Sequence, residues 1–180
     1  MHRRAACFAM LSGYALGARA SEGPPTVLRD AVPGIQLGGE GRLRLLGITV
    51  YEARLWVGQG FRREAFERSP FVLELHYLRA FNRDDIARRS IEEMARQPDT
   101  PRQSLADWEK QLRHAIPNVA RGDRLAGLHL PGQGAAFTAN GQPCGRVDDP
   151  TFSRHFFGIW LSPQTSEPAL RAALLARTTA

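Results

Sequence analysis

Four polar residues lie in stretches that otherwise consist of strand-forming apolar residues, and their chemistry is that of ligand recognition. Arg42 and Arg44 are two positions apart, so both side chains point to the same face if this segment forms a strand. A guanidinium pairs with a carboxylate through two parallel hydrogen bonds, and the hydroxyls of Tyr51 and Tyr77 can each donate one more. These groups predict a site for a molecule that carries an acidic head group.

Each of the four residues also has a purely structural interpretation. Arg42 and Arg44 face solvent if they lie on an edge strand, and the sequence alone does not choose which of the two faces a ligand. Tyr51 and Tyr77 are then core residues, each with one hydroxyl that finds a hydrogen-bond partner. Both interpretations stay open at this point.

The other chemically reactive residues form no catalytic or metal-binding pattern. His76, His114, His129 and His155 stand far apart, and none has a partner at a metal-ligand spacing. No serine lies in the Gly-x-Ser-x-Gly turn of esterases, which argues against covalent acyl transfer. We therefore expect neither a metal nor any other cofactor.

The elements that must position these residues are predicted from hydrophobic periodicity and turn signals. Strand-like runs are followed by two amphipathic helices, the first capped by Asn82, and then by a three-stranded meander with an Asn140-Gly141 turn. This order predicts an α+β fold, in which a large antiparallel sheet packs on one face against a layer of helices. Two adjoining strands are expected within 35–57 and single strands at 71–79, 124–130, 135–139 and 142–147. The expected helices lie at 82–97, 104–116, 149–162 and 168–176.

The first 20 residues resemble a cleavable signal peptide. Arg3 and Arg4 precede an apolar stretch at 5–16 that is too short to cross a bilayer, and Ala18-Arg19-Ala20 offers small residues at a cleavage site. We expect cleavage after Ala20, a periplasmic product without a transmembrane segment, and a single domain over residues 21–180. Only Cys144 then remains of the two cysteines, so an intramolecular disulfide cannot form.

The charge of the chain does not indicate a nucleic-acid partner. The full sequence has 24 basic and 18 acidic residues and a net charge of +6, of which Arg3, Arg4 and Arg19 belong to the expected signal. The remaining arginines are scattered among acidic residues and do not line one stripe, as a phosphate-binding face requires.

Several motifs resemble those of bacterial chalcone isomerase-like proteins. The main one runs from Gly39 to Trp56 and contains Val-Tyr-x-Ala-x-Leu-aromatic from Val50 onward. The others are Leu75-x-Tyr77, Gly122-Asp123, Gly158-Ile159-Trp160-Leu161 and the Leu170-Arg171 helix, and together they span most of the chain after the signal. The resemblance implies an open-faced β-sandwich with a ligand cleft between the sheet and the helices. The family contains plant enzymes that close a chalcone into a flavanone and relatives that bind fatty acids without catalysis.

The catalytic pattern of the plant enzymes carries over only at its arginine. That arginine matches Arg42 or Arg44, with an ambiguity of two residues in register. The other family positions are a threonine, a tyrosine and an asparagine near the first long helix, and a late hydroxyl. At these positions the chain has, respectively, Tyr51 or Glu52, Ile86, no asparagine after Asn82, and Thr165 or Ser166.

The leading hypothesis is a non-catalytic periplasmic protein that binds a fatty acid-like or other apolar acid, with Arg44 and Tyr51 holding the head group. A second hypothesis is an intramolecular lyase or isomerase that acts on a non-flavonoid substrate with different donors. A third is a cell-envelope module that binds a protein partner through the exposed face or an edge of the sheet.

Overall fold

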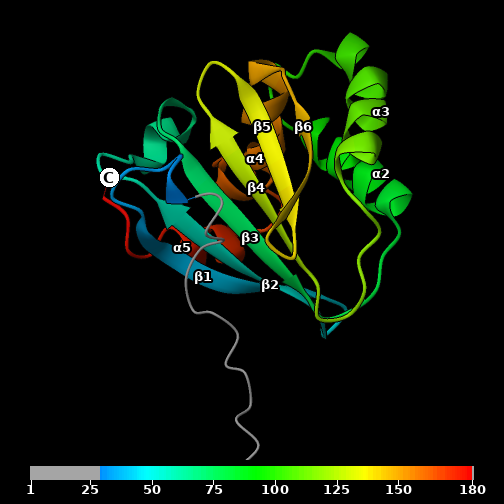
Figure 1. The fold of residues 1–180 in the computed structure, drawn as a ribbon, viewed down its shortest axis with the longest axis horizontal. Helices are drawn as coiled ribbons and strands as arrows, with labels where there is room; N and C mark the ends of the chain where they lie inside the picture. The colour runs from blue at the N-terminus through cyan, green and yellow to red at the C-terminus, as the bar shows by residue number, and fades with distance from the viewer. Residues whose placement is uncertain (1–28, 180) are drawn as a thin grey trace, which may run out of the picture.

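A twisted sheet of six antiparallel strands forms the centre of the molecule (Figure 1). The computed structural model describes residues 29–179. The strands follow one another across the sheet in chain order, so each pairs with its sequence neighbours. They are β1 (Gln36–Leu45), β2 (Ile48–Val57), β3 (Phe71–Tyr77), β4 (Arg124–Leu130), β5 (Gly134–Ala139) and β6 (Gln142–Val147).

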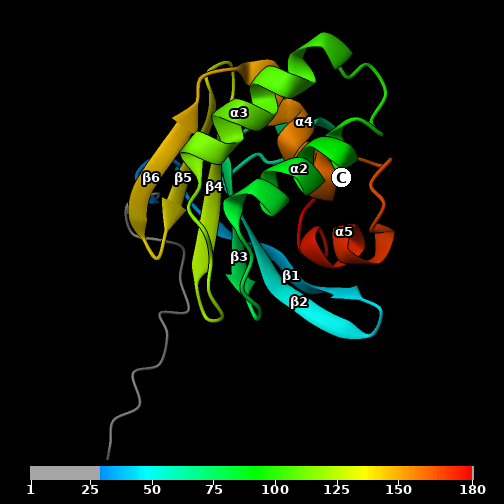
Figure 2. The same cartoon turned by 90° about the vertical axis from the view of Figure 1, so that its right-hand side faces the viewer.

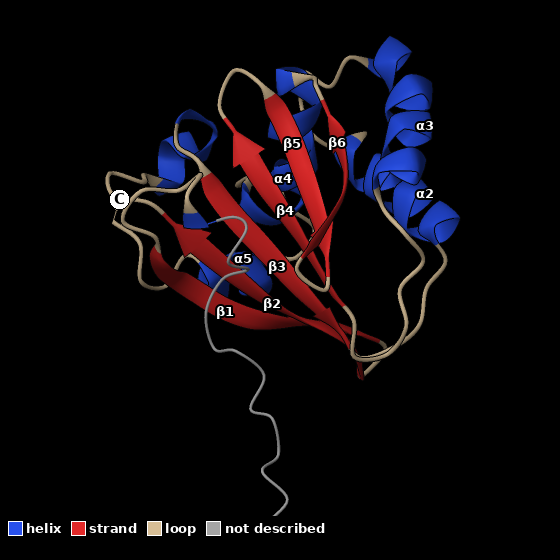
Figure 3. Cartoon of the chain, viewed as in Figure 1, coloured by secondary structure: helices blue, strands red, loops and turns tan. Residues whose placement is uncertain are grey.

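The helices gather on one face of this sheet, as the view along its edge shows (Figure 2). Two of them are inserted between β3 and β4, and two follow β6 (Figure 3). They are α2 (Arg83–Met94), α3 (Leu105–Ala115), α4 (Pro150–Leu161) and α5 (Pro168–Leu174), and short 3-10 turns lie at Arg63–Arg68 and Arg102–Ser104. The predicted α+β fold with an open-faced sheet is therefore confirmed, whereas the expected signal at 1–20 lies outside the described residues.

Local sequence signals explain where the helices begin. The Asn82 side chain accepts a hydrogen bond from the Asp85 backbone N–H and caps α2, as its position in the sequence predicts. Asp149 caps α4 in the same way through the N–H groups of Thr151 and Phe152, and Pro150 occupies the first turn, where its missing N–H costs nothing.

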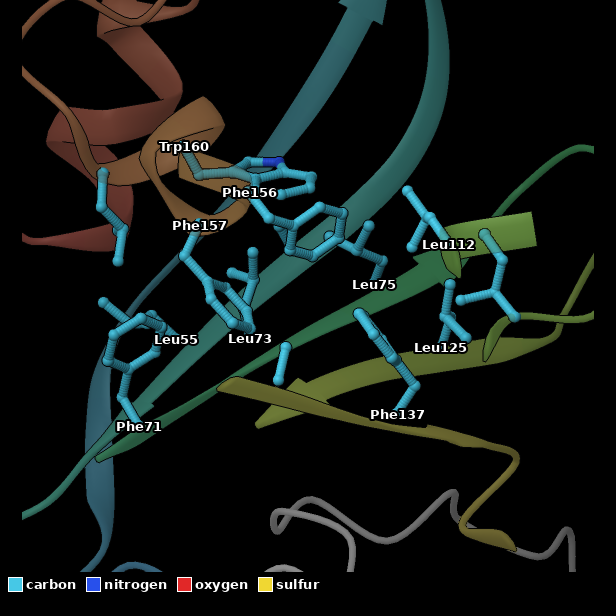
Figure 4. Packing of buried hydrophobic residues seen from close by; sticks show 14 of the residues in the cluster. Leu55, Phe71, Leu73, Leu75, Leu112, Leu125, Phe137, Phe156, Phe157 and Trp160 are labelled. Atoms are coloured by element: carbon cyan, nitrogen blue, oxygen red, sulfur yellow. The ribbon is translucent and has the colours of Figure 1, made fainter. Parts of the chain in front are cut away.

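Aromatic rings from α4 fill the space between that helix and the middle of the sheet (Figure 4). Phe157 packs edge-on against Phe71 of β3, with ring centroids 5.0 Å apart, and Phe71 stacks on the ring of His129 at 4.9 Å. A Cβ on Gly127 of β4 would lie 3.0 Å from the Phe157 ring, so the missing side chain makes room for it. The Phe and Trp residues of α4 are all buried.

The helix α5 lies directly on the edge strand β1. A Cβ on Gly39 would come within 2.2 Å of the Ala173 carbonyl oxygen, so only glycine permits this close approach. Just beyond α5, the backbone N–H of Arg177 donates to the carbonyl oxygen of Gly38 at 2.9 Å. The glycines of β1 therefore form the groove that receives the helix.

None of the helices α2–α5 lies over the opposite face of the sheet, which we call the outer face. It carries ion pairs between neighbouring strands, such as Arg42 with Glu52 at 2.8 Å and Arg124 with Glu74 at 2.9 Å. It also carries a small apolar cluster, whose buried members are Val32, Trp56, Val72, Ala126 and Leu128. The two faces thus differ in chemistry as the alternation of strand residues requires.

Candidate ligand-binding site

A cavity of about 270 Å³ lies between one end of the sheet and the helices α2 and α4. It exists because α2 packs mainly against α3 and α4 and stands away from the sheet, so side chains alone close the gap. Most of its wall is hydrocarbon. The aliphatic lining residues are Leu43, Leu45, Val50, Leu75, Ile86, Ile116, Leu125 and Ile159.

An irregularity in β2 shapes the sheet side of the cavity. Leu43 of β1 pairs with Tyr51 and the next residue, Arg44, pairs with Thr49, so Val50 is an extra residue in β2. Consecutive strand residues normally face opposite sides, but Val50 and Tyr51 are both buried and both line the cavity. The bulge therefore places two neighbouring side chains in one wall.

Two tyrosines bring hydroxyl groups into this apolar wall. The rings of Tyr51 and Tyr77 meet edge to face with centroids 5.8 Å apart, and the Trp160 indole N–H donates to the Tyr51 oxygen at 2.9 Å. No hydrogen bond joins the Tyr77 hydroxyl to another group of residues 29–179. Burial raises the pKa of both phenols well above its ordinary value, so both keep their protons at neutral pH. Both hydroxyls can donate to an acceptor inside the cavity.

Four of the charged residues that line the cavity, Asp85, Arg88, Arg89 and Glu93, lie on α2, and a fifth, Glu167, precedes α5. Arg88 pairs with Asp85 at 2.5 Å, and Arg89 lies 2.6 Å from Glu93 Oε1 in an ion pair that lacks good hydrogen-bond alignment. The other Glu93 oxygen accepts a hydrogen bond from Ser166 at 2.8 Å. Each of these arginines therefore has an acidic partner on its own helix, and the buried Glu93 carboxylate is already engaged.

The structure places the four residues predicted from the sequence in two groups. Tyr51 and Tyr77 line the cavity, whereas Arg42 and Arg44 do not and are exposed. Leu43 lines the cavity, so by alternation its two neighbours on β1 face outward. Arg44 and Tyr51 therefore lie on opposite faces of the sheet and do not surround one head group, as the sequence-based hypothesis expected. The structural interpretation, in which both arginines face solvent on an edge strand, is correct.

Sequence reasoning missed the polar groups of α2. Asp85, Arg89 and Glu93 are spaced four residues apart, so they form one stripe along the helix, beside Ile86 and Ser90. That spacing is visible in the sequence. It does not show, however, that the stripe borders a cavity, because the sequence does not reveal how far α2 stands from the sheet.

The remaining positions implied by the family pattern are occupied by groups with other tasks. Ile86 lines the cavity with a hydrocarbon side chain, and the Thr165 hydroxyl donates to the carbonyl oxygen of Ile159 at 2.5 Å. Ser166 lines the cavity, but its hydroxyl is bonded to Glu93. Among residues 29–179, no three metal-ligating side chains gather, and no helix there is long and apolar enough to span a bilayer.

The arrangement is suited to holding a small apolar molecule. The cavity offers hydrocarbon contacts and two neutral hydroxyl donors. Its buried carboxylate, Glu93, is paired with Arg89 and accepts a hydrogen bond from Ser166. These groups are suited to the recognition of an apolar molecule that has one oxygen acceptor.

Comparison with known proteins agrees with this fold. The structure is similar to the fatty-acid binding protein AtFAP1 of Arabidopsis thaliana, with a TM-score of 0.59 over 79% of this chain and 87% of that one. Only 14% of the aligned residues are identical, so this likeness concerns the fold. No curated protein matches the sequence. The family model described as chalcone isomerase-like matches residues 32–176, and the chain therefore belongs to the chalcone isomerase-like family.

Proposed function

We propose that this protein binds a small apolar molecule with an oxygen-bearing head group, such as a medium-chain fatty acid, and does not transform it. The observation that carries the proposal is the cavity of about 270 Å³, whose hydrocarbon wall is interrupted by the hydroxyls of Tyr51 and Tyr77. Small-molecule pockets in proteins commonly measure about 300–1,000 Å³. The cavity is slightly smaller, which favours a short or medium acyl chain. The fold shared with a fatty-acid binding protein supports the same class of ligand.

The head group is expected to lie against the two tyrosines and the acyl chain against the aliphatic residues. A buried oxygen acceptor needs hydrogen-bond donors, because leaving it unpaired costs about 1–3 kcal/mol. The Tyr77 hydroxyl has no partner among residues 29–179, and the Tyr51 proton is free because Tyr51 accepts from Trp160. Each methylene group removed from water adds about 0.8 kcal/mol of binding free energy.

The test is native mass spectrometry of the protein purified from cells, followed by titration with octanoic and decanoic acids. The variants Tyr51→Phe, Tyr77→Phe and the double variant keep the rings and remove the hydroxyls. Each single variant is expected to weaken binding about five- to tenfold, since it removes one hydrogen bond to the head group.

The matched control is Arg44→Ala, because this arginine does not line the cavity. It is expected to bind the acids as the wild type does. The proposal is refuted if the wild type neither carries a bound molecule nor takes up either acid. A loss of binding in Arg44→Ala with full binding in both tyrosine variants would restore the arginine-based site predicted from the sequence.

We further propose that the protein works in the periplasm after residues 1–20 are removed. This proposal is supported by the basic, apolar and small-residue regions of the N-terminal sequence. N-terminal sequencing of protein recovered from a periplasmic extract is expected to start at Ser21. Recovery of the uncut chain from the cytoplasm would contradict it.

A further inference from the structure

Exposed apolar side chains are concentrated on one hairpin of the described chain. The exposed large hydrophobic residues of that part of the chain are Leu45, Leu46 and Ile48, with 46%, 101% and 48% of their surfaces exposed. All three lie at the tip where β1 turns into β2, and Figure 2 shows this tip extending beyond the helices at one end of the sheet. Leucine at a fully exposed turn contributes nothing to a hydrophobic core.

The backbone of this turn makes the leucine more unusual. Leu46 and Gly47 have φ values of 50° and 80°, the left-handed conformation that two-residue hairpin turns require and that favours Asn-Gly. The hairpin between β5 and β6 has the same geometry, and its residues are Asn140 and Gly141, with φ values of 50° and 80°. The protein thus contains the favoured turn sequence at one hairpin and an unfavourable, exposed leucine at the other.

Three arginines lie at the same end of the sheet as the tip. Arg44 pairs with Thr49 in the register of the hairpin, and Arg79 follows Leu78, whose N–H donates to the carbonyl oxygen of Val50. Arg121 precedes Gly122, whose N–H donates to the carbonyl oxygen of Tyr77 at the same end of the sheet. All three arginines are exposed, and no ion pair within residues 29–179 involves them.

Three acidic groups near this end are already engaged. Glu52 pairs with Arg42, and Asp85 pairs with Arg88. Asp123 accepts hydrogen bonds from the Ala120 N–H and the Asn140 side chain. The surface therefore presents an aliphatic tip among arginines that lack acidic partners in the described chain.

We propose that this end of the molecule docks on an anionic lipid bilayer, with Leu45, Leu46 and Ile48 entering the interface and Arg44, Arg79 and Arg121 pairing with lipid phosphates. Apolar side chains flanked by cations are the combination that holds proteins at such surfaces. Leu45 also lines the cavity, so docking brings the cavity wall to the membrane. The passage of a ligand between bilayer and cavity rests on the function proposed above, whereas docking itself does not.

The test is flotation of the purified protein with vesicles of phosphatidylcholine, with and without phosphatidylglycerol. Leu46→Asn installs the turn sequence of the other hairpin, so it is expected to fold at least as stably as the wild type. It should weaken binding to anionic vesicles about tenfold or more, because a leucine side chain is lost from the interface. Residues 1–28 are the same in every variant, so the differences report on the hairpin.

The charge contribution is tested separately. Arg44→Gln and Arg79→Gln are each expected to weaken binding to anionic vesicles about fivefold, and added salt should weaken wild-type binding. Arg102, exposed in the turn that precedes α3, supplies the matched control Arg102→Gln, which should bind as the wild type does.

The proposal is overturned if Leu46→Asn binds anionic vesicles as tightly as the wild type, or if the wild type binds neither vesicle type. It is also overturned if the tip instead joins two copies of the chain, seen as a dimer in sedimentation that Leu46→Asn dissociates. Binding of decanoic acid by the same variants is expected to be unchanged. A protein that docks but binds no acid would contradict the proposed function and leave the docking surface intact.

Discussion

The helices α4 and α2 face the same side of the sheet but fill the space before it differently. α4 packs on β4 and β5 and sends Phe152, Phe156 and Phe157 into the core, where they are almost fully buried. α2 packs against its neighbouring helices and offers Ile86 and Ser90 to the gap, which remains a cavity. The cavity is therefore a consequence of the side chains that α2 presents and of the placement of this helix.

The largest expected effect is a difference in the free energy of unfolding between a variant of the α4 region and a variant of the cavity. Phe157→Ala removes a ring held between Phe71 and Gly127, and it should lower the free energy of unfolding by about 3–5 kcal/mol. Ile86→Ala, at the cavity, should cost only ~1 kcal/mol, because its side chain already borders empty space. Urea denaturation of both variants measures the difference. Equal costs would mean that the cavity is as well packed as the α4 region.

A smaller effect is the pH dependence of stability that arises from His129 in the packed region. Burial lowers the pKa of His129, whose ring donates to the carbonyl oxygen of Glu67 at 3.0 Å and accepts from the Ser153 hydroxyl at 2.7 Å. The unfolded chain therefore binds a proton at a higher pH than the folded chain does. Between about pH 6.5 and the lowered pKa of His129 in the folded chain, protonation favours the unfolded chain. Over this range the free energy of unfolding should fall by up to about 1.4 kcal/mol per pH unit because of this group.

Urea denaturation at a series of pH values measures this dependence. His129→Gln retains a donor and an acceptor but does not titrate, so its stability should fall less steeply below pH 6.5. Burial also lowers the pKa of His155, which adds to the slope in both proteins. The difference between the two slopes therefore isolates His129, and identical slopes would show that its ring takes up a proton without unfolding.

A modest gain in stability is expected to accompany a clear loss of binding when the cavity is filled. Ser90→Leu places a hydrocarbon side chain in the cavity, and we expect it to raise the free energy of unfolding by about 0.5–2 kcal/mol and to exclude decanoic acid. Ser153→Leu is the matched control in the packed region, where overpacking and the lost bond to His129 should destabilise the protein. A destabilised Ser90→Leu would show that the cavity cannot accept a side chain.

Most of the fold could be predicted from the sequence because its signals are local. Asn82 marks the start of α2, Pro150 the start of α4, and Asn140-Gly141 the turn between β5 and β6. Each feature depends on a few neighbouring residues, whose conformational preferences are strong. The burial of the α4 aromatic residues follows equally directly from their spacing.

The candidate site was only half predictable because it depends on long-range geometry. Alternation showed that Arg42 and Arg44 share a face, but which face the helices cover depends on how distant segments pack. The bulge at Val50 is a feature of strand pairing that hydrophobic periodicity does not reveal. Tyr51 and Tyr77 line the cavity because both stand on the covered face, and this too required the structure.

The seating of α5 in the glycine groove of β1 has a consequence for the timing of folding. The last helix of the chain, α5, packs on β1, the first strand. The backbone N–H of Arg177 donates to the carbonyl oxygen of Gly38, 139 positions earlier in the sequence. Contacts between such distant segments form slowly, since a long loop must close first. During synthesis, the contact between α5 and β1 therefore waits for almost the entire chain, and this delay suits a protein that we propose crosses a membrane before it folds.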